Sequence, residues 1–107
     1  MTDVIENFGG MDATSQMLYH VNFGEPLLDA GSRVVAPVKT LVPRTDHAAN
    51  SLGTWDSFPN EKAGFEEQVY FAELLANAEG NSQVLLKNAH GTQGVTLRFN
   101  KNKLPCF

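Results

Sequence analysis

The feature that most constrains the fold is an alternation of side chains between residues 15 and 23. From residue 17 onward, every second position is apolar or aromatic, as Met17, Tyr19, Val21 and Phe23 show. Because successive side chains of an extended strand point to opposite faces, this pattern predicts a strand over 15–23 with one apolar face. His20 and Asn22 then lie side by side on the other face. Gly24-Glu25-Pro26 follows and is expected to end the strand.

Most other apolar segments are short, rich in β-branched or aromatic residues and bounded by Gly, Pro or Asn, which is typical of strands. The further strands expected on this basis cover residues 3–8, 33–36, 38–42, 68–73, 82–87 and 95–100. Pro37 separates two of them and implies an edge strand, a bend or a bulge. The last two are expected to form a hairpin or meander across 88–94.

In the remaining segments, apolar residues do not recur with the spacing of a strand or a helix. Residues 46–64 are rich in Asn, Gly, Ser, Asp and Pro and predict a long loop, in which Trp55 and Phe58 act as apolar anchors. Residues 74–78, which follow the strand predicted at 68–73, can alternatively form a helix. The predicted fold class is therefore all-β, with mostly antiparallel strands and a long central loop.

Composition excludes several classes of partner. Hydrophobic residues make up 42% and charged residues 19% of the 107 residues, as in an ordinary globular protein with a single domain. The formal net charge is −4 and the basic residues are scattered, so we expect no nucleic acid and no anionic membrane as partner. No apolar run approaches the ~18 residues of a membrane span, and the N-terminus does not resemble a signal peptide. These features favour a cytoplasmic location.

His20 and Asn22 are the leading candidates for a functional site. An imidazole can serve as acid, base or donor near neutral pH, and a carboxamide both donates and accepts hydrogen bonds. This pair suits a polyhydroxylated ligand such as a sugar. On the residues alone, the favoured interpretation of His20 is a partly buried histidine that is hydrogen-bonded to a neighbouring strand.

Several separated motifs resemble, in the right order, a bacterial branch of the aldose 1-epimerase (galactose mutarotase)-like family. They are Leu-Tyr-His-Val-Asn-Phe-Gly-Glu-Pro-Leu-Leu at 18–28, Ala-Pro-Val at 36–38, Val-Pro-Arg at 42–44, Glu-Gln-Val-Tyr-Phe at 67–71, Leu-Arg-Phe-Asn at 97–100 and Leu-Pro-Cys-Phe at 104–107. The resemblance implies a β-supersandwich, in which two large antiparallel sheets pack together and a concave face holds a carbohydrate. Proteins of that family are several times longer, so we expect residues 1–107 to be an internal fragment that forms one partial domain.

The resemblance also implies a chemistry. In an active mutarotase, a base removes the proton of the anomeric hydroxyl while an acid protonates the ring oxygen, and the ring opens and recloses as the other anomer. His20 resembles the family's catalytic histidine, although the family reads His-x-Tyr-Phe-Asn and here Asn22 precedes Phe23. The family's catalytic base is a glutamate on a late strand, in a segment that we expect this chain to lack.

Two further groups of polar residues are candidates for substrate binding. Arg44 and Asp46, with His47 beside them, follow a predicted strand, where they could bind sugar hydroxyls, a carboxylate or a phosphate. The alternative is a local Arg44–Asp46 ion pair on the surface. Glu67 and Gln68 belong to the family-like motif at 67–71. Gln68 would share a strand face with Tyr70, whereas Glu67 is either half-buried with a partner, facing a cavity, or a solvated glutamate.

Other chemistries have less support. His20, His47, His90, Asp46 and Cys106 contain no close-spaced ligand pair, so neither a metal nor a cofactor is expected. The single cysteine, Cys106, is interpreted as a core residue. The leading interpretation is a carbohydrate-binding, aldose 1-epimerase-like protein whose ligand is a sugar or sugar derivative. A non-catalytic sugar-binding module and a β-rich structural or oligomerisation fragment stay open, and a homodimer through exposed strand edges is a further expectation.

Overall fold

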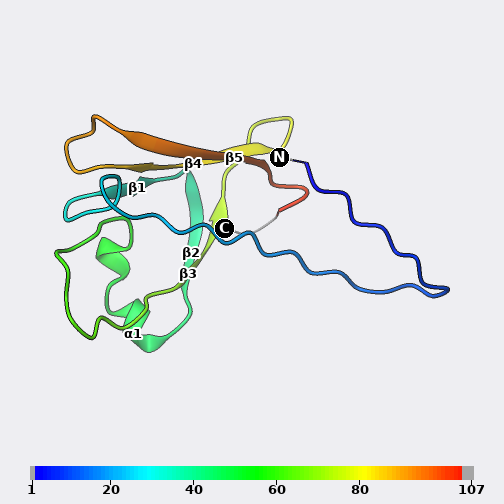
Figure 1. Ribbon diagram of the computed structural model, residues 1–107, viewed down its shortest axis with the longest axis horizontal. Coiled ribbons are helices and arrows are strands. Elements are labelled where there is room, and N and C mark those ends of the chain that lie inside the picture. The colour runs from blue at the N-terminus through cyan, green and yellow to red at the C-terminus, as the bar shows by residue number, and fades with distance from the viewer. Residues whose placement is uncertain (1, 105–107) are drawn as a thin grey trace.

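The computed structural model describes residues 2–104 as two small antiparallel sheets preceded by a long arm of irregular chain (Figure 1). The strands are β1 (Arg33–Val35), β2 (Val38–Pro43), β3 (Tyr70–Leu74), β4 (Asn81–Lys87) and β5 (Gly94–Asn100). Between β2 and β3 lie the short helix α1 (Asp46–Ala49) and the 3-10 helix η1 (Leu52–Thr54). The all-β prediction is confirmed. Cys106, which was expected in the core, lies outside the described residues.

One sheet has three strands in the order β1-β4-β5. The predicted hairpin is present as β4 and β5, which pair without interruption from Asn81 opposite Asn100 to Lys87 opposite Gly94. The Asn88 side chain closes the turn, because its Oδ1 accepts from the backbone N–H of Thr92 at 2.9 Å. Buried residues of β4, namely Ser82, Val84 and Leu86, alternate along the strand with more exposed residues. The strand therefore has one core face and one solvent face.

Pro37 marks the point where the chain leaves the first sheet and enters the second, two-stranded sheet β2-β3. The Leu75 N–H donates to the Pro37 carbonyl at 2.7 Å, and the pairing register shifts between Val38 and Thr40. The predicted bend and irregularity at Pro37 are therefore confirmed. The helical reading of 74–78 is wrong, because the chain passes from β3 into a turn at Gly80, whose φ is +81°.

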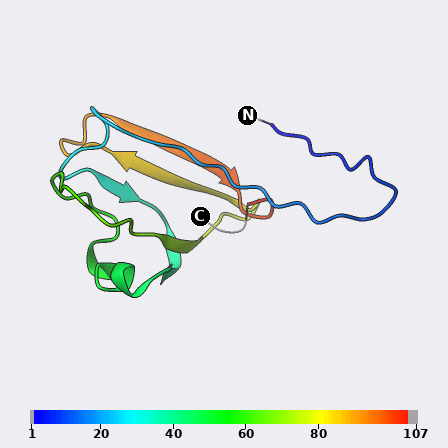
Figure 2. The ribbon, with the colours of Figure 1, turned by 60° about the horizontal axis from the view of Figure 1, so that its bottom comes forward.

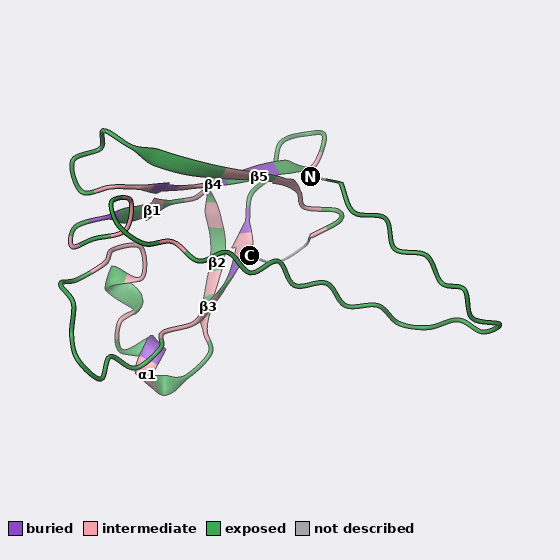
Figure 3. Cartoon of the chain, viewed as in Figure 1, coloured by how far each residue is buried: buried purple, intermediate pink, exposed green. Residues whose placement is uncertain are grey.

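The core lies between the two sheets. Its fully packed members are Ala72 and Leu74 from β3 and Val84 from β4. The partly buried side chains around them are Val34, Ala36, Val38, Leu41 and Phe99. Burial is concentrated on the strands, whereas the arm is exposed over almost its whole length (Figure 3).

The strands predicted at 3–8 and 15–23 are wrong, because residues 2–23 form an arm without strands. The arm runs away from the sheets and then returns, as both ribbon views show (Figures 1 and 2). The Tyr19 hydroxyl donates to Asp3 Oδ2 at 2.5 Å and joins the two limbs, and this bond raises the pKa of Tyr19. A strand requires a neighbour to complete its ladder, and none of the five strands in the described part of the chain pairs with the arm.

The long loop at 46–64 is confirmed apart from its two short helical turns. Its later part lies beside β1, where the Gly31 N–H donates to the Phe58 carbonyl at 2.9 Å and the Phe58 N–H returns a bond to Ser32 at 3.1 Å. Trp55 and Phe58 are both half-buried. This agrees with their expected role as anchors of the loop.

Candidate functional site

His20 and Asn22 lie in the returning limb of the arm, and both are exposed. Within residues 2–104, no hydrogen bond or ion pair engages either side chain. His20 is therefore not the buried, strand-bonded histidine of the alternative interpretation. Both side chains are accessible to a ligand.

Arg44 and Glu67 come together where β2 ends and β3 is about to begin. The Arg44 N–H donates to the Val69 carbonyl at 2.9 Å, which aligns the two segments. Arg44 Nη1 then lies 3.8 Å from Glu67 Oε1, and both side chains are mostly exposed. Glu67 is thus a solvated glutamate, and Arg44 is paired with it and not with Asp46 as in the alternative of a local ion pair.

The short helix α1 follows directly and places His47 against the entry to β3. Thr45 caps it, since its Oγ1 accepts from the Ala48 N–H at 3.2 Å. Asp46 is exposed in the first turn, where a negative charge suits the helix N-terminus. Fully buried Ala48 anchors the turn, and its carbonyl accepts a hydrogen bond from the Tyr70 hydroxyl at 3.0 Å.

Gln68 is the centre of a polar group that we call the α1 cluster: His47, Ser51, Gln68 and Tyr70. Gln68 Nε2 donates to Ser51 Oγ at 2.9 Å and lies 3.5 Å from His47 Nε2. The Tyr70 hydroxyl is 3.5 Å from Gln68 Oε1, so Gln68 and Tyr70 share a face as their spacing predicted. The other imidazole nitrogen, His47 Nδ1, is 3.9 Å from Glu66 Oε2.

The α1 cluster offers hydroxyl, carboxamide and imidazole groups at the surface, a set able to exchange hydrogen bonds with sugar hydroxyls. The sequence predicted Gln68 as a site residue, placed Tyr70 on the same strand face and pointed to His47, whereas it did not predict Ser51 as a partner. The alternation of residues 68 and 70 carried a signal for Tyr70. Ser51 is 17 residues from Gln68, and no local pattern links the two.

Among residues 2–104, no group of three or more His, Cys, Asp or Glu side chains could hold a metal ion. Among the same residues, no helix has the length and apolar character needed to cross a membrane.

Comparison with known proteins identifies the family. Residues 1–107 match the family described as "Domain of unknown function (DUF4432)". The fold matches the crystal structure of a protein described as a "putative aldose 1-epimerase" from Klebsiella pneumoniae, with 32% identity and a TM-score of 0.79. The match covers 82% of this chain and 23% of the Klebsiella protein, so the chain spans about a quarter of that length. No curated protein matches. The chain belongs to the DUF4432 family and has the β-rich fold of the aldose 1-epimerase-like proteins.

Proposed function

We propose that the chain is part of a carbohydrate-binding, aldose 1-epimerase-like protein whose ligand is a sugar or sugar derivative. The observation that carries this proposal is the accessible His20–Asn22 pair, in a chain 32% identical to the Klebsiella protein. One residue separates the two side chains, so both face one side wherever the limb is extended. An imidazole beside a carboxamide can protonate one oxygen of a sugar while holding another.

His20 acts as the proton donor in this proposal. It gives its proton to the ring oxygen while an opposed base takes the proton of the anomeric hydroxyl. The C1–O5 bond breaks, and the anomeric carbon becomes an aldehyde. Rotation of the aldehyde and reclosure, with both proton transfers reversed, give the other anomer. The family resemblance assigns the base to a glutamate on a late strand.

Asn22 orients the sugar beside His20. Arg44, Asp46, Glu67 and Gln68 supply further groups for hydroxyls or an anionic substituent, since they gather where β2 ends and β3 begins. The Arg44 guanidinium can donate two parallel hydrogen bonds to such an anionic group. Gln68 is the most constrained of the four, because Ser51 and Tyr70 hold both ends of its carboxamide.

Anomer exchange tests the proposal. Exchange of a panel of aldoses is measured by NMR with the intact gene product, which would include the glutamate base, and with its His20→Ala and His90→Ala variants. We expect the intact protein to accelerate exchange, His20→Ala to abolish the acceleration, and His90→Ala to leave it unchanged. His90 is the matched control, because it is an exposed histidine in the turn between β4 and β5.

A non-catalytic sugar-binding module is the second candidate. It is favoured by one observation: in the described residues, no carboxylate forms an ion pair or hydrogen bond with His20. Sugar binding without faster exchange in the same NMR samples would establish the module and reject the enzyme. If no aldose bound at all, both would be rejected in favour of a structural or oligomerisation role.

A further inference from the structure

The solvent face of the three-stranded sheet is basic, although the whole chain has a net charge of −4. Strands β1, β4 and β5 carry three charged side chains, Arg33, Lys87 and Arg98, and contain no Asp or Glu. Arg33 is opposite Lys87 and Arg98 is opposite Gln83 in the pairing register. Because residues 83 and 87 of one strand point to the same side, all three cations share one face.

The three cations differ in their partners. Arg33 forms an ion pair with Asp56 at 3.1 Å. Within the described part of the chain, neither Lys87 nor Arg98 forms an ion pair with a carboxylate. Arg98 is exposed, and its guanidinium is available to an anion.

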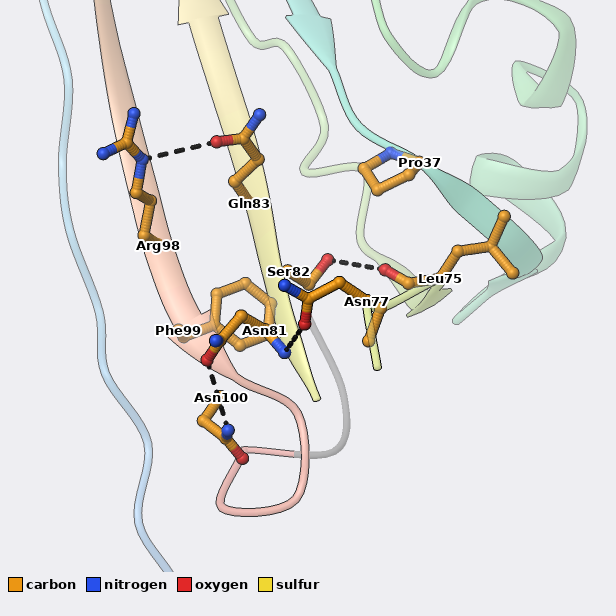
Figure 4. A pocket seen from close by; sticks show the side chains of 10 residues that line it. Pro37, Leu75, Asn77, Asn81, Ser82, Gln83, Arg98, Phe99 and Asn100 are labelled. Atoms are coloured by element: carbon orange, nitrogen blue, oxygen red, sulfur yellow. Dashed lines mark hydrogen bonds between the residues drawn. The ribbon is translucent and has the colours of Figure 1, made fainter. Parts of the chain in front are cut away.

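An open cavity of about 760 Å³ lies at the Arg98 end of this sheet (Figure 4). Its polar lining consists mainly of carboxamides, from Asn77, Asn81, Gln83 and Asn100. Of the residues that line it, only Arg98 is charged. Asn81 is opposite Asn100 and Gln83 is opposite Arg98, so these four side chains form two neighbouring pairs on one face of the hairpin.

The carboxamide oxygens of this lining are already occupied. Three of the bonds that occupy them are visible in Figure 4: Asn81 N–H to Asn77 Oδ1 at 2.8 Å, Asn100 Nδ2 to Asn81 Oδ1 at 3.2 Å, and Arg98 Nε to Gln83 Oε1 at 3.3 Å. The fourth oxygen, Asn100 Oδ1, accepts from the Asn102 N–H at 3.0 Å.

What stays available is a set of donors. Within residues 2–104, no hydrogen bond uses the side-chain NH₂ groups of Asn77, Asn81 and Gln83 or the terminal nitrogens of Arg98. Gln83 holds the Nε edge of the guanidinium, and the free edge points away from Asn77, Asn81 and Asn100, as Figure 4 shows. The cation and the neighbouring carboxamide of Gln83 are together complementary to an anion that carries further acceptor oxygens.

We infer that this cavity binds an anionic monosaccharide, with the carboxylate or phosphate on Arg98 and a further acceptor oxygen on the neighbouring carboxamide of Gln83. The inference rests on the proposed function for the carbohydrate class of the ligand. It adds a second site at the far end of β3 from the α1 cluster, since Tyr70 begins that strand and the cavity residue Leu75 follows it.

Binding is tested by titrating the full chain with glucose, glucuronate and glucose 6-phosphate. The variants are Arg98→Gln, Asn81→Asp and the matched control Lys62→Gln, which removes an exposed positive charge from the loop before β3. We expect the anionic sugars to bind more tightly than glucose. Arg98→Gln should weaken their binding by about ten-fold to a hundred-fold, as expected for loss of a charge-assisted hydrogen bond.

Asn81→Asp keeps the acceptor that Asn100 uses and replaces the free NH₂ group with a negative charge, so it should also reduce anion binding. Lys62→Gln should leave binding unchanged. The ratio of glucuronate to glucose 6-phosphate affinity shows which anion the site prefers. Equal binding of glucose and the anionic sugars, or anion binding unaffected by Arg98→Gln and Asn81→Asp, would overturn the inference.

The same experiment separates this site from the proposed function. His20→Ala should abolish anomer exchange and leave the preference for anionic sugars intact. Anion preference without anomer exchange would therefore reject the enzyme while this site stands. Anomer exchange without anion preference would reject this site alone.

Discussion

Glu73 illustrates how one residue can connect distant segments of this chain. Its Oε1 lies 3.0 Å from Lys39 Nζ, in β2, and 3.1 Å from Lys101 Nζ, just after β5. The hydrogen bonds from Lys39 and then Lys101 lower the pKa of Glu73 below its ordinary 4.5, and they outweigh the opposing effect of desolvation. The carboxylate thus links the two sheets in its charged form.

This link predicts a pH dependence of stability. Because the folded-state pKa of Glu73 is lowered, its contribution is fully present above the ordinary pKa of 4.5 and is lost as pH falls through the folded value. Glu73→Gln should reduce the loss of stability between neutral and acidic pH. Free energies of unfolding from urea titrations between about pH 7 and pH 3 measure this slope.

Glu79→Gln is the control for that series, because in the described residues Glu79 forms no ion pair with a lysine or arginine. It should keep the acid dependence of the parent chain. An identical pH profile for the parent and Glu73→Gln would show that the two lysine contacts do not contribute in solution.

Some residues of the candidate site could be predicted from the sequence, and others could not. Gln68 and Tyr70 share a face because two residues separate them, and a period of two is a local property. The contact between Gln68 and Ser51 depends on how α1 and η1 turn the chain back towards β3, which no local pattern encodes. The roles of His20 and Asn22 stay predictions, although the structure shows that both are accessible.

At the scale of elements, β3 is the strand on which the packing of the two sheets depends. Its burial alternates, with Ala72 and Leu74 in the core and Phe71 and Glu73 on the outer side. Leu74 is only 2% exposed, whereas the next residue, Leu75, is 54% exposed. Two adjacent leucines therefore differ almost completely in environment.

This difference predicts unequal effects of the same substitution. Leu74→Ala should lower the free energy of unfolding by about 2–5 kcal/mol, because it removes buried methyl groups and leaves a cavity. Leu75→Ala should change it by less than about 0.5 kcal/mol, as at other exposed positions. Urea denaturation of both variants measures the two values. Equal losses would contradict the placement of Leu74 between the sheets.

Elements formed by local interactions were predicted well. The β4–β5 hairpin depends on neighbouring segments and on a turn that Asn88 closes within its own loop, so its sequence contains most of what it needs. The bend at Pro37 follows from a ring that cannot continue a ladder. The strand predicted in the arm is wrong because alternation of apolar and polar side chains is necessary for a strand but not sufficient. A strand also needs a second segment with which its backbone can pair.

Many large apolar side chains are exposed in the described part of the chain. Several large apolar side chains of the arm are exposed, among them Val4, Phe8, Met11 and Leu18. On the two-stranded sheet, Val42 and Phe71 are directly opposite each other and are 51% and 50% exposed. Both strands of that sheet are edge strands, and such edges are typical sites of association.

We therefore predict that the chain associates with itself through this sheet. Phe71→Lys should shift the population towards monomer, because it places a charge in the centre of the apolar pair. Leu52→Lys is the control, since it adds the same charge to an exposed apolar residue of η1, outside the sheets. Size-exclusion chromatography with light scattering over a range of concentrations measures the masses. A monodisperse monomer of the unmodified chain would contradict the prediction.

The sequence by itself determined the all-β class, the positions of the hairpin strands, the break at Pro37 and the residue types of the candidate sites, because these depend on side-chain period, ring geometry and chemistry within short segments. The tertiary structure alone decided that the arm forms no strand, that Ser51 joins Gln68 and that Arg98 and Asn77 line one cavity. Those outcomes depend on which distant backbones approach each other. A contact between segments far apart in the chain is a property of the whole packing and leaves no periodic trace in either segment.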